Sequence, residues 1–162
     1  MASDLQSMRI CQSVAPVADL FAADTSSVKG DVVNLRDYSE CMFVVFTGVG
    51  GTGVSTITVD SCDTVTPTTA TAIPFMYKRM TGPAGTDTEG NWTNATSTGF
   101  SSTAANGDIY QCYVKADDLN GADKYCRLHA IESTNGAVLG GIMVILGGSR
   151  FAENGGRRTV LA

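Results

Sequence analysis

Three consecutive stretches decide the predicted fold of this chain: Met42-Phe-Val-Val-Phe46, then Thr47-Gly-Val-Gly-Gly-Thr-Gly53, then Val54-Ser-Thr-Ile-Thr-Val-Asp60. The first is apolar on both faces of an extended chain, which is typical of a central strand. In the third, Ile57 and Val59 alternate with polar residues, as in a strand with one buried face. The glycine-rich stretch between them is typical of a turn. Together the three stretches predict a β-hairpin.

The same period of two returns along the rest of the chain. Proline cannot donate to a strand ladder, so Pro74 indicates a strand start or a sheet edge. Asn120-Gly121 lies in a polar turn between two alternating segments and predicts a second hairpin. A short helix is expected over residues 17–23. The predicted strands are residues 42–46, 54–60, 73–79, 109–116, 125–131 and 138–146, with residues 28–35 as a further candidate.

Length and composition favour a single domain. The chain has 162 residues, of which 43% are apolar and 17% charged, enough for one hydrophobic core. Short strands separated by polar turns predict an all-β fold, a β-sandwich or a jelly-roll-like barrel, with flexible N- and C-terminal arms. The expected organisation is an N-terminal arm at 1–27, a β-sandwich domain at 28–148 with a long loop at 81–107, and a C-terminal tail at 149–162.

Charge and hydropathy narrow the function classes. The chain has 11 Lys and Arg against 16 Asp and Glu, and this net charge of −5 argues against a nucleic-acid partner. The longest apolar stretch, residues 137–146, is split by Gly140 and Gly141 and is too short to cross a membrane. The first residues lack the basic start and the apolar run of a secretory signal, so synthesis and use without export are expected.

Five cysteines and one histidine make a metal site improbable on sequence grounds. No CxxC is present, so the zinc-finger and zinc-ribbon patterns fail. Without a secretory signal, the cysteines are interpreted as reduced, buried thiols. One alternative stays open, because the two predicted hairpins would place partners on neighbouring strands. Those alternative disulfides are Cys41–Cys62 and Cys112–Cys126.

Two motifs suggest ligand binding, but in both a purely structural interpretation fits the sequence better. Gly48-Val-Gly-Gly-Thr-Gly53 fits the dinucleotide fingerprint, but that motif needs a helix after it, and the next residues predict a strand. Asp117, Asp118, Asn120 and Asp123 could offer oxygens to calcium, but their spacing does not match an EF-hand, and turn chemistry explains them. No cofactor and no metal are therefore expected.

His129 is the only imidazole, and it alternates with Arg127 and Ile131 on a predicted amphipathic strand. No nucleophile elbow or other catalytic signature accompanies it. The sequence therefore predicts a structural histidine and a protein that is not an enzyme.

Several segments give the chain a resemblance to a known family. They are Val33-Asn-Leu-Arg-Asp-Tyr38, Cys41-Met-Phe-Val-Val-Phe-Thr-Gly48, Thr58-Val-Asp-Ser-Cys-Asp63 and Ala72-Ile-Pro-Phe-Met-Tyr-Lys-Arg79. In these segments and in its Gly/Thr-rich style, the chain resembles bacteriophage head decoration or cement proteins, which are minor capsid proteins. The resemblance implies a Thr-rich β-sandwich on the outside of the virion that cements neighbouring capsomers. It implies the major capsid protein as partner and a homo-oligomer, dimeric or trimeric, made in the host cytoplasm.

The expected partner interface combines the long loop and the C-terminal tail. Trp92, alone in a Gly/Thr-rich loop, either packs that loop onto its own sandwich or anchors a partner. The predicted interface residues are Trp92, Phe100, Arg150, Phe151, Arg157 and Arg158. Two alternatives stay open. One is a phage neck or tail ring subunit, and the other is a carbohydrate-binding β-sandwich module with Trp92, Tyr77 and Phe100 as stacking platform.

Overall fold

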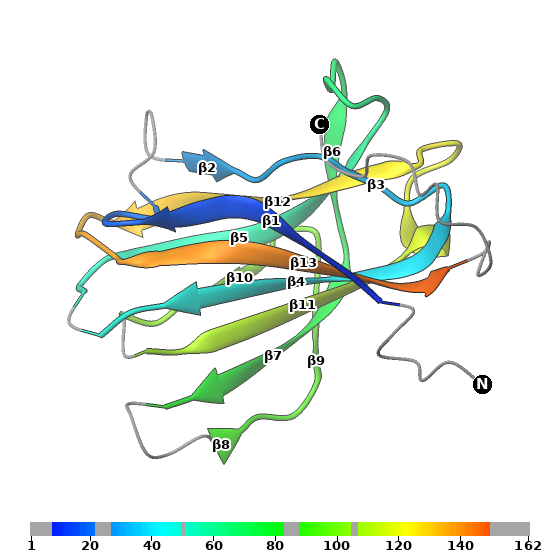
Figure 1. Ribbon diagram of the computed structural model, residues 1–162. Coiled ribbons are helices and arrows are strands. Elements are labelled where there is room, and N and C mark those ends of the chain that lie inside the picture. Colours follow the sequence, from blue (N-terminus) through cyan, green and yellow to red (C-terminus); the bar gives the residue numbers. More distant parts are fainter. Residues whose placement is uncertain (1–7, 22–26, 50, 83–87, 105–106, 150–162) are drawn as a thin grey trace.

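The computed structural model describes residues 8–21, 27–49, 51–82, 88–104 and 107–149. Two antiparallel sheets pack face to face (Figure 1). The sheets do not close into a barrel, so of the two predicted architectures the β-sandwich is confirmed. No α-helix occurs in the described residues, in agreement with the all-β prediction.

The larger sheet, sheet A, has seven strands. Its order is β1-β13-β4-β11-β7-β8, and β9 also pairs with β7. The strands are β1 (Arg9–Val17), β13 (Gly140–Ser149), β4 (Tyr38–Thr47), β11 (Ile109–Lys115), β7 (Phe75–Thr81), β8 (Thr88–Glu89) and β9 (Thr93–Ala95). Strand β4, which the sequence predicts as central from its two apolar faces, lies between β13 and β11.

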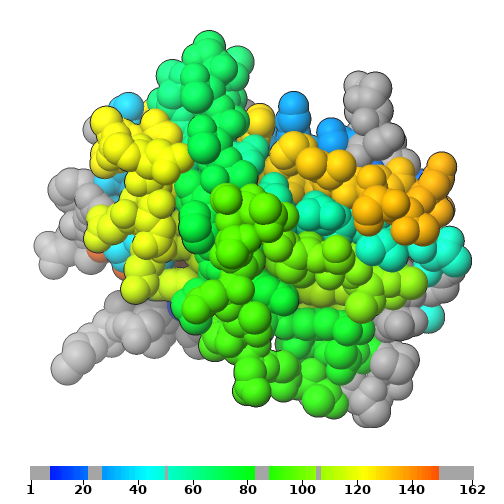
Figure 2. Space-filling view, turned by 180° about the vertical axis from the view of Figure 1, so that it is seen from behind, coloured from blue at the N-terminus to red at the C-terminus, as the bar shows by residue number. Residues whose placement is uncertain are grey.

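The smaller sheet, sheet B, has the order β10-β5-β12-β2, with β3 also on β12 and β6 also on β5. Its strands are β10 (Phe100–Ser101), β5 (Val54–Cys62), β12 (Tyr125–Thr134), β2 (Ser27–Lys29), β3 (Val33–Asn34) and β6 (Ala70–Ile73). A 3₁₀ turn, η1 (Ala116–Asp118), precedes β12. The turn from β5 to β6, residues 63–69, projects at the top of the molecule (Figure 2).

The hydrophobic core lies between the sheets. Every second residue from Cys41 to Thr47 in β4, and every second residue of β11, is buried, as expected for strands with one inward face. Burying these side chains is the main favourable term in folding. The inward residues include Phe43, Val45, Tyr110, Ile142 and Val144 from sheet A and Ile57, Val59, Leu128 and Ala130 from sheet B.

Both predicted hairpins are wrong. Strand β4 belongs to sheet A and β5 to sheet B, so the glycine-rich stretch crosses between the layers. The second connection, from β11 through η1 to β12, crosses in the same way. In both cases two successive strands bury apolar faces against each other across the core instead of pairing edge to edge. Strand periodicity specifies which face is buried, but not which strand lies next to it.

The N-terminal arm and the helix are also not as expected. Residues 9–17 form β1 and pair with β13, while Leu20 and Phe21 are buried in the core without a helix. Register shifts between Gln12 and Val17 break the period of two, which hides this strand in the sequence. At the other end β13 extends to Ser149, and the rest of the C-terminal tail lies outside the described residues.

The long loop at 81–107 is partly regular. It contains β8 and β9 on sheet A and β10 on sheet B, so its described part spans both layers. Gly99, at φ +75°, immediately precedes β10, which pairs with β5. An added Cβ there would lie 2.1 Å from the backbone oxygen of Ile57, so only glycine fits this close approach.

Candidate interaction surface

The outer side of sheet A carries many apolar side chains. Along β4, Met42, Val44 and Phe46 point outward because they alternate with the buried Cys41, Phe43 and Val45. The strand register aligns outward residues of the neighbouring strands with them, for example Met143 opposite Val44 and Tyr113 opposite Met42. We call this surface the apolar face. Its apolar residues are Ile10, Met42, Val44, Phe46, Met76, Met80, Ile109, Tyr113, Met143 and Ile145. The row of Met143 and Val44 also holds the polar side chains Gln12 and Gln111 and ends at Lys78 on β7.

Exposed apolar side chains concentrate on or beside this sheet. Among the described residues, all exposed large apolar side chains except Val65 and Ile131 lie in or next to strands of sheet A. They are Met8, Ile10, Val17, Val49, Met76, Trp92, Leu139 and Met143. Contiguous apolar surface of this kind, unlike single exposed residues, marks interaction sites.

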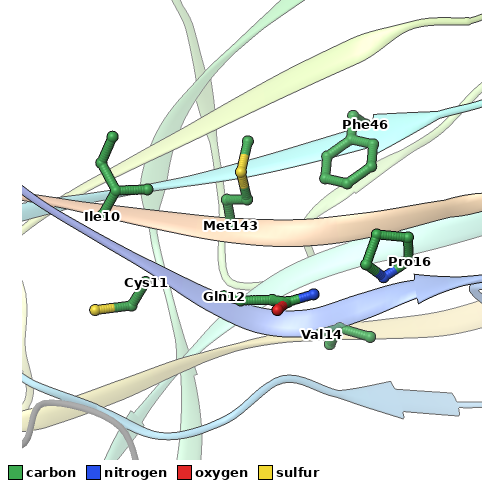
Figure 3. Close-up of a pocket in the computed structure, with 7 residues that line it drawn as sticks. All are labelled: Ile10, Cys11, Gln12, Val14, Pro16, Phe46 and Met143. Atoms are coloured by element: carbon green, nitrogen blue, oxygen red, sulfur yellow. The ribbon is translucent and has the colours of Figure 1, made fainter.

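One part of the apolar face is hollowed. A hollow of about 210 Å³ lies over β1, β13 and β4, lined by Ile10, Cys11, Gln12, Val14, Pro16, Phe46 and Met143 (Figure 3). Gly141 makes room for the Phe46 ring, because an added Cβ would lie 2.7 Å from Phe46 Cζ. Ile10 lines the hollow and is 66% exposed.

Polar groups border the apolar face in opposite-sign pairs. Lys78 forms an ion pair with Glu89, and its Nζ lies 5.0 Å from the ring centre of Trp92. Lys115 lies opposite Glu40 in the strand register. Glu40 accepts a hydrogen bond from the Tyr113 hydroxyl at 2.5 Å, and this bond, with burial, raises the pKa of Tyr113 to about 12. The border therefore carries little uncompensated charge.

The outer side of sheet B carries a polar cluster around Asp60. Asp60 on β5 accepts from Arg127 Nε at 3.2 Å, and His129 Nδ1 lies 3.6 Å from the same carboxylate oxygen. Burial lowers the pKa of His129 more than the nearby Asp60 carboxylate raises it. The imidazole therefore favours its neutral form more than a free histidine does.

Of the predicted interface residues, the structure places Trp92 and Phe100 apart. Trp92 packs edge-on against Tyr113, with ring centres 6.1 Å apart, and stays 43% exposed beside the apolar face. Phe100 stacks on Tyr77 at 3.9 Å and packs against the core. Trp92, Tyr77 and Phe100 do not form a common platform. Arg150, Phe151, Arg157 and Arg158 lie outside the described residues.

The cysteines are not arranged as either alternative disulfide requires. Cys41 and Cys62, like Cys112 and Cys126, lie on strands of different sheets, and all five thiols are free. Instead Cys41 Sγ and Cys126 Sγ lie 3.7 Å apart across the core. Their contact and their burial raise the pKa of Cys126, so its thiol stays neutral.

The two segments that suggested ligand binding have structural roles in the fold. The glycine-rich stretch leads into strand β5, as predicted, and not into a helix. In the acidic turn, Asp118 accepts from the Lys115 backbone NH and Asp123 accepts from Ser61 Oγ at 2.7 Å. Gly121 there has φ +52°, consistent with the predicted turn. Within the described ranges no three His, Cys, Asp or Glu side chains come together as a metal site.

A buried network that sequence reasoning missed anchors the end of the long loop. Asp108 is 1% exposed and accepts from Arg79 Nη2 at 2.8 Å and from Thr103 Oγ1 at 2.6 Å. Tyr110 donates to the same carboxylate oxygen at 3.3 Å. These residues come from β7, β11 and the segment before β11. No sequence motif predicts these contacts, because only the folded chain brings the residues together.

Comparisons with known proteins find similarity to solved structures and none at the level of sequence. No family model matches the chain, and no curated protein matches its sequence. The crystal structure of SPBc2 prophage-derived protein YomS is similar, with a TM-score of 0.47 and 10% identity over 86% of this chain and 91% of that chain. A similarity of this size assigns no function. In the described part of the chain no helix is long and apolar enough to cross a membrane.

Proposed function

We propose that this protein is a non-catalytic structural protein of a bacteriophage virion. In this proposal it binds the outer surface of an assembled capsid, through the major capsid protein, and holds neighbouring capsomers together. The observation that carries the proposal is the apolar face of sheet A. A wide, charge-poor surface with aromatic and methionine side chains has the composition of a protein-binding surface.

The physical basis of cementing is preferential binding to the assembled state. A protein that binds the assembled shell and not its free subunits stabilises the shell by mass action. Many contacts repeated over a symmetric lattice add up to a strong clamp, even where each is weak. A rigid β-sandwich suits this role because little order has to be gained on binding.

Two other functions have less support. A phage neck or tail ring subunit needs the same kind of surface but far fewer copies per particle. A carbohydrate-binding module would need aromatic rings on one platform, and Tyr77 and Phe100 instead stack on each other against the core. The sequence resemblance to head decoration proteins favours the capsid surface over both.

Copy number in purified particles tests the proposal. Quantitative mass spectrometry of virions from the source would give copies of this chain relative to the most abundant shell subunit. We expect a ratio of the same order as that of the shell subunit. A ratio far below it would support the neck or tail ring instead. Complete absence from particles would contradict any virion role.

A second test addresses the C-terminal tail. Arg150, Arg157 and Arg158 are the proposed contacts for acidic groups of the shell, because cations at an interface steer and orient binding to an acidic partner. Replacing all three by alanine should weaken co-sedimentation with capsids that lack this protein, and more so at low salt. Lys29→Ala and Lys124→Ala, which remove exposed cations of the sandwich, are the controls. Unchanged co-sedimentation would remove the tail from the interface.

A further inference from the structure

The apolar face leaves one question open, which is what covers it before a shell is available. Under the proposed function, on which this inference rests, the protein is made free in the host cytoplasm and meets capsids later. An apolar surface of this extent exposed to water is an aggregation hazard. The partner present from the moment of synthesis is a second copy of the same chain.

We infer that, before a shell is available, the apolar faces of two copies pack against each other in a two-fold symmetric dimer, which dissociates when the same surface binds the shell. In such an interface the same patch is used twice, so it must be complementary to itself. Size, charge and shape of the apolar face are the three properties that decide whether it meets this condition.

The size fits. Strands β1, β13, β4, β11 and β7 lie about 4.8 Å apart, so together they present a width of about 24 Å. Their lengths of 7 to 10 residues correspond to about 23–33 Å. The outer side of these five strands, which includes the apolar face, therefore measures roughly 700 Å² in projection, close to the roughly 800 Å² per partner of a standard specific interface.

The charge distribution fits as well. Two identical patches bring like charges together wherever a charge is uncompensated, which costs free energy. On the apolar face Lys78 is paired with Glu89, and Lys115 lies opposite Glu40. The net charge of −5 is therefore carried elsewhere in the chain, and it does not oppose contact through this surface.

The shape provides a projection beside a recess. Ile10 is the most exposed of the large apolar side chains on the apolar face, and it lines the hollow that also includes Phe46 and Met143. In a two-fold arrangement whose axis runs across the strands, β1 and β13 of one copy lie over β1 and β13 of the other, and Ile10 of each copy enters the hollow of the other. Figure 3 shows Ile10, Met143 and Phe46 rising on the same side of β13 and β4 around this recess. Methionine side chains adapt easily to such a contact.

The test is the mass of the purified 162-residue chain in solution. We expect sedimentation equilibrium to give twice 16.9 kDa at micromolar concentrations. The double variant Ile10→Glu/Met143→Glu places four carboxylates in the interface of a dimer, and its dissociation constant should rise by at least about 100-fold. Ile131→Glu is the matched control, because Ile131 is 45% exposed on the outer side of sheet B and should leave the dimer intact.

Folding and function are checked separately. Ile10 and Met143 are exposed by 66% and 37%, so the double variant should keep the wild-type circular dichroism spectrum. A wild-type protein that stays monomeric at about 100 μM, or forms trimers, would overturn the dimer. So would a double variant that folds and still dimerises.

The copy-number measurement distinguishes the two proposals. A monomer that is abundant in virions would reject the dimer and keep the capsid function, with the shell subunit then covering the apolar face. A dimer that is absent from virions would do the reverse.

Discussion

The outer sides of the two sheets differ in what their strands present to the surroundings. Along β4 in sheet A, outward positions hold Met42, Val44 and Phe46. Along β12 in sheet B, the corresponding outward positions hold Arg127 and His129, bound to or near Asp60, and then the apolar Ile131. A sheet with one face in water usually alternates apolar and polar residues. Sheet B follows this rule more closely than sheet A. The departure indicates that sheet A has a contact surface on its outer side, in addition to the inner side that it packs against sheet B.

The same comparison explains how each outer side is stabilised. On sheet B, the polar groups have hydrogen-bond or ion-pair partners within the chain, so they need no second molecule to satisfy them. On sheet A, the apolar side chains gain most if another surface removes them from water. Substitutions on sheet B should therefore change folding stability, and substitutions on the apolar face should change association.

The largest expected effect is on sheet B. Replacing Asp60 by alanine leaves Arg127, whose side chain is only 14% exposed, without its carboxylate. Removing one partner of a buried ion pair typically costs several kcal/mol, and we expect the free energy of unfolding to fall by about 3 kcal/mol. Urea denaturation of the variant and of Asp117→Ala, an exposed acidic control, measures the difference. Equal midpoints for the two would contradict a stabilising role for the pair.

On sheet A, Phe46→Ala should act mainly on association. The Phe46 ring forms one wall of the hollow, and its removal leaves Ile10 of a second copy without a contact. The dissociation constant of the dimer should rise by about 10- to 30-fold, as for a moderate interface hot spot. Val65→Ala, which shortens an exposed side chain away from sheet A, is the control for sedimentation equilibrium.

The contribution of Phe46 to folding can be separated from this effect. Urea denaturation of Phe46→Ala within the monomeric Ile10→Glu/Met143→Glu background measures stability alone. The loss in free energy of unfolding in this monomer is then compared with the change in free energy of dimer dissociation. If the two are equal, Phe46 stabilises the fold and is not part of an interface.

A smaller effect concerns pH and the polar side of sheet B. Burial lowers the pKa of His129 below the ordinary value of 6.5, so the unfolded chain binds a proton more readily than the folded one. Stability should be unaffected by His129 above about pH 6.5, and it should fall as the pH drops from there toward the lowered pKa. Urea denaturation at pH 7.5 and 5.5 should show this loss in the wild type and a smaller loss in His129→Gln.

His129 is the only histidine in the chain, so no other imidazole contributes in this range. An equal loss of stability in the wild type and in His129→Gln would assign the effect to carboxylates instead.

The smallest expected effect lies at the border of the apolar face. The hydrogen bond to Glu40 is the main cause that raises the pKa of Tyr113 to about 12. Glu40→Gln should therefore lower that pKa toward the ordinary value of 10. Titration of ¹³C-labelled tyrosines by NMR measures it, with Tyr110, whose pKa is raised mainly by burial, as internal control. An unchanged Tyr113 would mean that burial, not Glu40, dominates.

Much of the fold follows from local pattern. The strands at 42–46, 54–60, 109–116, 125–131 and 138–146 are predicted from their period of two and are confirmed as strands of a sandwich. The strand at 9–17 is missed because bulges interrupt its period. The two hairpins are wrong because a turn-like sequence can equally well carry the chain across to the opposite layer.

The apolar face could have been found partly from the sequence. The stretch Met42-Phe-Val-Val-Phe46 is apolar on both sides, which indicates that its outer side also meets an apolar surface. That pattern does not say whether a helix, a loop or another molecule provides the contact. Ile10 and Phe46 are far apart in the chain, and only the pairing of β1, β13 and β4 brings them to one hollow.

The sequence by itself determined the all-β class and the positions of strands β4, β5, β11, β12 and β13, because side-chain alternation and apolar runs are local properties of an extended chain. The tertiary structure alone decided which strands are neighbours, that Cys41 meets Cys126, and that the exposed apolar residues gather on sheet A. Those features depend on contacts between residues distant in sequence, and the free energy that selects them is shared over the whole core.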